Sequence, residues 1–126
     1  VLDRYRRVVP SFNDDIQGTG GVATAAIQAA CRISGRRFRD SRIVLSGAGA
    51  AGLGIARQLR VRLRQSGLSG DELTRAILVT DSRGIVAADR ECLYDYNKVV
   101  AWPGALVVVL GLILVVLNVL DNVVTA

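Results

Sequence analysis

The stretch Arg42–Gly52, RIVLSGAGAAG, decides the fold of this chain. Its first half is a short β-branched run between polar flanks, which predicts a strand, and Ala50–Gln65 after it predicts a helix. A GxGxxG run between a strand and a helix is typical of a dinucleotide-binding turn, in which the glycines permit the tight turn, the approach of the pyrophosphate and close helix packing. The alternative is a glycine-rich packing loop without a ligand. The candidate cofactor-binding residues here are Gly47, Ala48, Gly49, Ala50, Ala51 and Gly52.

A second strand follows the helix. Ala76–Thr80, AILVT, predicts it, and Asp71–Arg75 before it reads as a polar turn or short helical piece. Upstream, the alanine-rich segment Thr19–Ile33 has apolar residues near helical spacing and is followed by Ser34-Gly35, which predicts a helix. Strand, helix and strand in this order form a βαβ unit with parallel pairing. The predicted fold class is therefore α/β, with part of a Rossmann-type parallel sheet and an apolar C-terminal segment.

Asp81 ends the second predicted strand, where a carboxylate can accept hydrogen bonds from the adenosine ribose hydroxyls. It lies 29 residues after Gly52, further than usual, and the polar insertion 68–75 accounts for the excess. The alternative is an aspartate that starts the turn Asp-Ser-Arg-Gly. Ser82 and Arg83 join it as candidate cofactor contacts, and Arg83 or Lys98 would neutralise the 2′-phosphate of NADP. The sequence leaves NAD and NADP both open.

Asp14 and Asp15 are adjacent carboxylates that directly precede the first predicted helix. Their mutual repulsion favours a nearby cation, and Mg²⁺ or Mn²⁺ prefers carboxylate oxygens. Acidic residues at a helix N-terminus also interact favourably with the helix dipole, so a capping cluster is the alternative.

The run Phe12–Thr19, FNDDIQGT, together with the helix, strand, GAGAAG turn and Asp81 that follow, resembles the malic enzyme family over residues 2–101. The resemblance implies oxidative decarboxylation of malate to pyruvate and CO₂ with reduction of NAD or NADP. It also implies a Mg²⁺ or Mn²⁺ ion, with Asp15 as a metal ligand and Asp14 as a second active-site carboxylate. The family's other metal ligands, its catalytic tyrosine and its lysine would lie before residue 1, so we expect these residues alone to be inactive.

The resemblance divides the chain into three parts: residues 1–19 end a catalytic and metal-binding region, residues 20–101 form part of an NAD(P)-binding domain, and residues 102–126 are an apolar segment. That segment reads as a helix and strand of the same domain. The resemblance to malic enzymes further implies a homo-oligomer, located in the cytoplasm or, in a eukaryote, in a mitochondrial or plastid matrix. A non-enzymatic alternative remains open, because residues 99–117 carry no charge. It is a membrane-tethered dinucleotide-binding module with residues 99–120 as the anchor.

The composition of the chain argues against several kinds of ligand and chemistry. The 126 residues carry a net charge of +5, almost all of it from scattered arginines without interleaved aromatic residues, so we predict no nucleic-acid binding. The chain has no histidine, which excludes histidine-based acid–base chemistry and histidine metal ligands within it. Its two cysteines, Cys31 and Cys92, have no metal-binding spacing.

Overall fold

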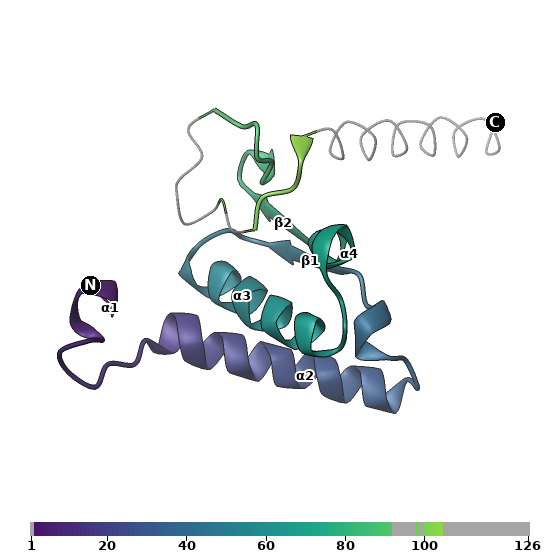
Figure 1. Cartoon of the computed structure of the whole chain (residues 1–126), viewed down its shortest axis with the longest axis horizontal. Coiled ribbons are helices and arrows are strands. Elements are labelled where there is room, and N and C mark those ends of the chain that lie inside the picture. The colour runs from purple at the N-terminus through teal and green to yellow at the C-terminus, as the bar shows by residue number, and fades with distance from the viewer. Residues whose placement is uncertain (1, 92–97, 99, 105–126) are drawn as a thin grey trace.

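The computed structural model describes residues 2–91, 98 and 100–104 (Figure 1). The predicted apolar segment, apart from residues 102–104, lies outside them, as does most of the predicted anchor. No helix among the described residues is long and apolar enough to cross a membrane. The helices are α1 (Leu2–Tyr5), η1 (Asp14–Gly18), α2 (Thr19–Ile33), η2 (Phe38–Asp40), α3 (Ala50–Gln65) and α4 (Gly70–Ala76), and the strands are β1 (Ile43–Ser46), β2 (Ile77–Asp81) and β3 (Gly84–Ile85).

The sheet has the order β1-β2-β3. β1 and β2 pair in parallel, with Ile43 opposite Ile77 and Ser46 opposite Thr80, so the predicted βα-crossover and parallel pairing are confirmed. β3 returns antiparallel to β2, with Asp81 opposite Gly84. The sequence prediction had a turn at this place but no third strand.

Helix α3 lies between the sheet and α2 (Figure 1). Its leucines pack against alternate residues of β2, as expected for a strand with one face on the core. Trp102 joins the same core, since its indole Nε1 donates a hydrogen bond of 2.6 Å to the carbonyl of Ile77. The buried apolar residues are Leu53, Ala56, Leu59, Leu63, Leu68, Leu73, Ala76, Ile77, Val79, Val86, Ala87, Val100 and Trp102.

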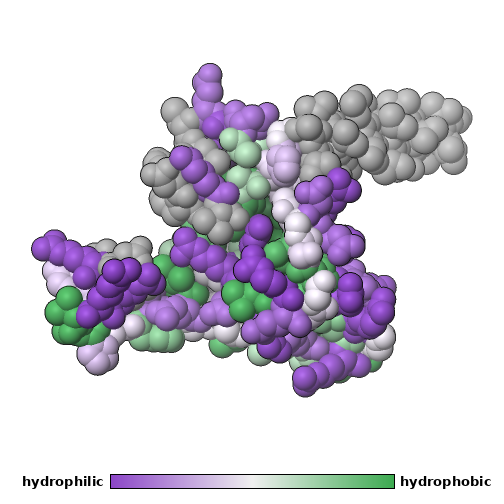
Figure 2. Space-filling model, viewed as in Figure 1, coloured by the Kyte–Doolittle hydropathy of each residue, from purple (hydrophilic) through white to green (hydrophobic). Residues whose placement is uncertain are grey.

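Large apolar side chains also remain exposed on α2 and α3 (Val22, Ile33 and Val61), on β1 and near the N-terminus. Val44, which alternates with core-facing residues of β1, is 66% exposed. In the N-terminal segment, at the left of Figures 1 and 2, hydrophobic surface lies beside hydrophilic surface. The exposed apolar residues of this segment are Tyr5, Val8, Val9 and Phe12.

Two glycines let α2 and η1 approach α3 more closely than any side chain would permit. A Cβ atom on Gly54 of α3 would lie 2.2 Å from the carbonyl oxygen of Ile16 in η1. A Cβ atom on Gly20 of α2 would lie 2.8 Å from the carbonyl oxygen of Gly54. Backbone atoms cannot rotate away as a flexible side chain can, so both positions require glycine.

Gly20 and its neighbour Gly21 provide a matched test of this packing. Gly20→Ala should lower the free energy of unfolding by about 1–3 kcal/mol, because the added methyl group meets backbone atoms. Gly21→Ala should raise it by about 0.5–1 kcal/mol, because alanine favours the helix and nothing lies within 4 Å of the new Cβ. Chemical denaturation of the two variants measures both changes, and equal effects would contradict the close packing.

Candidate functional site

The glycine loop, residues 47–52, follows the carboxyl end of β1 and forms the start of α3. Gly47 has a φ of 120°, a conformation that favours glycine, and its N–H donates a 2.8 Å hydrogen bond to the carbonyl of Thr80 in β2. A Cβ atom on Gly52 would lie 1.8 Å from the carbonyl oxygen of Gly47, so the first turn of α3 closes tightly on the loop. The structure thus places Gly47 at the tight turn, as predicted, and packs Gly52 against the backbone of that turn, where the prediction had it packing on the strand.

The first turn of α3 is open to an anion. Gly49 is the N-cap residue and has no side chain to accept from the first N–H groups, and no acidic residue lies in that turn. Gly49, Ala50 and Ala51 are exposed, and a Cβ on Gly49 would meet nothing within 4 Å, so a ligand can approach the backbone there. Ala48 is half-buried against the core. Such a helix N-terminus favours negative charge through its free N–H groups and its dipole.

Asp81 lies at the same edge of the sheet, because β1 and β2 are parallel and their carboxyl ends are adjacent. Its Oδ1 accepts a 2.8 Å hydrogen bond from the N–H of Arg83, so the turn-starting role, the alternative to the predicted cofactor role, is observed. Its Oδ2 accepts from Nη1 of Arg90 at 2.5 Å, and Arg90 also donates to the carbonyl of Ile85. Ser82 and the side chain of Arg83 are exposed at the tip of the hairpin. Arg90, which the sequence prediction did not include, therefore orients the carboxylate at this edge.

These contacts hold the pKa of Asp81 below its usual range. The hydrogen bond from the Arg83 N–H is the largest cause, and the hydrogen bond and charge of Arg90 act in the same direction, while burial opposes them. Asp81 is thus a carboxylate at neutral pH.

Asp81→Asn should destabilise the protein at neutral pH and have less effect in acid. Because the folded-state pKa is lowered, the contribution of the charged group is complete above the unfolded pKa, about 3.9, and is lost as the pH falls through the folded-state value. The free energies of unfolding of the two proteins, measured from pH 7 downward, should therefore converge. A difference that stays constant over this range would show that the charge of Asp81 contributes nothing.

Asp14 and Asp15 lie in the first turn of η1, a π-helical turn that continues into α2. The cap of this turn is Asn13, whose Oδ1 accepts from the N–H of Ile16 at 3.0 Å, while Gln17 Oε1 accepts from the N–H of Asn13 at 2.9 Å. This reciprocal pair supplies the capping that the sequence analysis considered for the aspartates. Both aspartates are exposed, and neither side chain forms an ion pair with another described residue.

The described residues do not form a metal site by themselves. No group of three or more aspartate, glutamate, cysteine or histidine side chains among them is arranged to hold a metal ion. A divalent cation such as Mg²⁺ takes six oxygen ligands, so Asp15 alone would leave most of them to other groups.

Helix α3 connects the two candidate regions. The glycine loop forms its N-terminus, and η1 packs against Gly54 in its second turn. The sequence prediction missed Gly20 and Gly54, although a signal was present: glycine in a helix interior is costly and indicates close packing.

Comparison with known proteins shows which family the chain resembles. Residues 16–122 match the family model described as the malic enzyme NAD-binding domain. The chain is 42% identical over 103 residues to the NAD-dependent malic enzyme of Sodalis glossinidius, which covers 82% of this chain and 18% of that protein. It is also 42% identical over 98 residues to the malolactic enzyme of Leuconostoc mesenteroides, covering 78% of this chain and 18% of that protein.

A solved structure shares the fold. The NAD-dependent malic enzyme of Thermotoga maritima matches with a TM-score of 0.61 and 27% identity, over 81% of this chain and 26% of that one. The chain thus spans less than a fifth of the length of the curated relatives named here.

Proposed function

Because the chain belongs to the malic enzyme family, we propose that its residues form the dinucleotide-binding part of an enzyme that converts malate to pyruvate and CO₂ and reduces NAD. One observation carries the proposal: α3 begins with an open N-terminal turn, and η1, the turn that carries the aspartates, packs against the same helix at Gly54. The N-terminal turn of α3 would bind the cofactor, and the aspartates of η1 would bind the divalent metal ion that holds the substrate.

The glycine loop would bind the pyrophosphate. Its free N–H groups in the first turn of α3 offer hydrogen bonds to the phosphate oxygens, and the absence of side chains at Gly47 and Gly49 permits close approach. Asp81, ionised and oriented by Arg90, would accept hydrogen bonds from the ribose hydroxyls. The same negative charge disfavours a 2′-phosphate, which supports NAD over NADP, in line with the NAD-dependent relatives.

Asp15 would be a ligand of a Mg²⁺ or Mn²⁺ ion, and Asp14 would be the second carboxylate of the site. When bound, such an ion acts as a Lewis acid that polarises the substrate oxygens, and the nicotinamide accepts the hydride. The contribution of this chain is to hold both carboxylates exposed, without an ion pair to any other described residue, on a turn fixed by Asn13 and Gln17. The homo-oligomeric state and the cellular compartment stay predictions.

Steady-state assays test the proposal on the intact native protein, not on these 126 residues alone. With malate, NAD and Mg²⁺ it should form pyruvate and NADH, and Asp15→Asn should lower kcat/KM by at least about a hundredfold, since Lewis-acid stabilisation contributes several kcal/mol. Asp71→Asn is the matched control, because Asp71 is also exposed in a first helical turn, and its activity should be unchanged.

Three outcomes would contradict the proposed function or one of its parts. No oxidation of malate by the native protein would overturn the function, and near-normal turnover of Asp15→Asn would remove the metal assignment. Lactate in place of pyruvate would favour the second candidate, a malolactic enzyme, which the relative from Leuconostoc mesenteroides suggests.

A further inference from the structure

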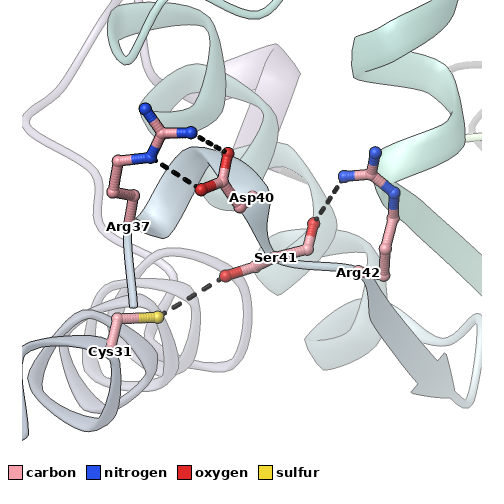
Figure 3. Close-up of polar contacts among 5 residues, drawn as sticks. All are labelled: Cys31, Arg37, Asp40, Ser41 and Arg42. Carbon is pink, nitrogen blue, oxygen red and sulfur yellow. Dashed lines mark hydrogen bonds and ion pairs between the residues drawn. The ribbon is translucent and has the colours of Figure 1, made fainter. Parts of the chain in front are cut away.

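A second region of the molecule has the composition of a ligand site, and it lies away from the glycine loop. It is an open cavity of about 940 Å³ between the C-terminal half of α2, the η2 turn and the first residue of β1. The glycine loop leaves the other end of β1, so the two regions are separated by the length of that strand. Figure 3 shows the polar residues of this cavity, with Cys31 on α2 facing Ser41 and with Arg37 and Arg42 on either side.

The floor of the cavity is apolar, and its margin is polar. Ile27 and Ala30 of α2 and Ile43 of β1 supply the apolar surface. The hydroxyl of Ser41 lies 3.5 Å from the thiol of Cys31, and both groups line the cavity. An apolar surface with a few convergent polar groups is typical of small-molecule sites, and the volume is within their usual range.

The charge at the margin is positive and incompletely compensated. Arg37 forms a bidentate ion pair with Asp40, with nitrogen–oxygen distances of 2.7 and 3.2 Å (Figure 3). Arg36 and Arg42 line the same cavity, and neither forms an ion pair with another described residue. Arg42 donates one hydrogen bond of 3.2 Å to the carbonyl of Ser41, which leaves most of its N–H groups available.

We propose that this cavity binds a small amphipathic oxyanion, a carboxylate or phosphate carried on an apolar body, with Arg36 and Arg42 as the anion-binding groups. The guanidinium group suits this role, because its planar N–H donors match both carboxylate and phosphate oxygens. The apolar body would cover Ile27, Ala30 and Ile43. This site does not depend on the proposed enzymatic activity.

Cys31 provides a reporter that is already in place, since its free thiol lines the cavity. The experiment follows alkylation of Cys31 in the native protein by the neutral reagent iodoacetamide, read by mass spectrometry on the peptide that contains it. Phenyl phosphate and benzoate are the anionic probes, and benzyl alcohol is the neutral one. For ligands of this size we expect a dissociation constant on the order of 1 mM, so 10 mM of an effective anion should slow alkylation about tenfold.

The two anionic probes distinguish the two chemistries, since protection by phenyl phosphate alone indicates a phosphate ligand and protection by benzoate alone a carboxylate. Arg36→Gln and Arg42→Gln should each reduce the protection to the level of benzyl alcohol. Arg39→Gln is the matched control, because Arg39 belongs to the same exposed segment but does not line the cavity, and protection should persist.

Several results would overturn the proposal. Equal protection by benzyl alcohol and the anions would show an apolar groove without anion preference. Protection that survives both arginine substitutions would exclude the proposed binding groups. Absence of protection by every probe would show that the cavity takes no such ligand, and a Cys31 that does not react in the native protein would show that the cavity is closed to small molecules there.

Discussion

The arrangement of the candidate site depends on one backbone contact, between Gly54 of α3 and Ile16 of η1. No side chain can stand at residue 54, because its first carbon would lie 2.2 Å from a carbonyl oxygen. Gly20 extends the contact by one turn of α2, again against the backbone of Gly54. Since the packed interior tolerates little displacement, this contact fixes the position of the Asp14-Asp15 turn relative to α3.

The same helix carries the other half of the site at its N-terminus. Gly47 and Gly52 close the loop between β1 and α3, and the hydrogen bond from Gly47 to Thr80 ties that loop to β2 and so to Asp81. Helix α3 therefore begins with an exposed turn that lacks capping side chains, and at Gly54 it packs against the turn that carries two exposed carboxylates. A helix N-terminus favours anions and a pair of carboxylates favours cations. This combination suits the proposed reaction, in which a phosphate-bearing cofactor and a metal-bound acid must meet.

Much of this fold could be predicted from local sequence. The bounds of α2 and α3 agree with the predicted helices, and β1 and β2 lie within one residue of the predicted strands, because apolar spacing and glycine stops are local signals. The π-helical turn of η1, the hairpin strand β3 and the pairing of Arg90 with Asp81 were not predicted. Each depends on tertiary contacts: η1 on the backbone of α3, β3 on the ladder with β2, and Arg90 on a carboxylate nine residues away in the chain. The positions of the candidate residues were predictable, whereas the contacts that orient them were not.

The most direct test of the central contact is hydrogen exchange in the native protein with Gly54→Ala. The amides of Ile16 and Gln17 are bonded to Asn13 within η1, and those of β2 are bonded in the sheet. If the contact holds η1 in place, the variant should exchange the amides of Ile16 and Gln17 at least about tenfold faster, a loss of some 1.4 kcal/mol of local stability, while the β2 amides keep their rates. Unchanged exchange at Ile16 and Gln17 would contradict the account, because it would show that the turn carrying the aspartates does not need Gly54.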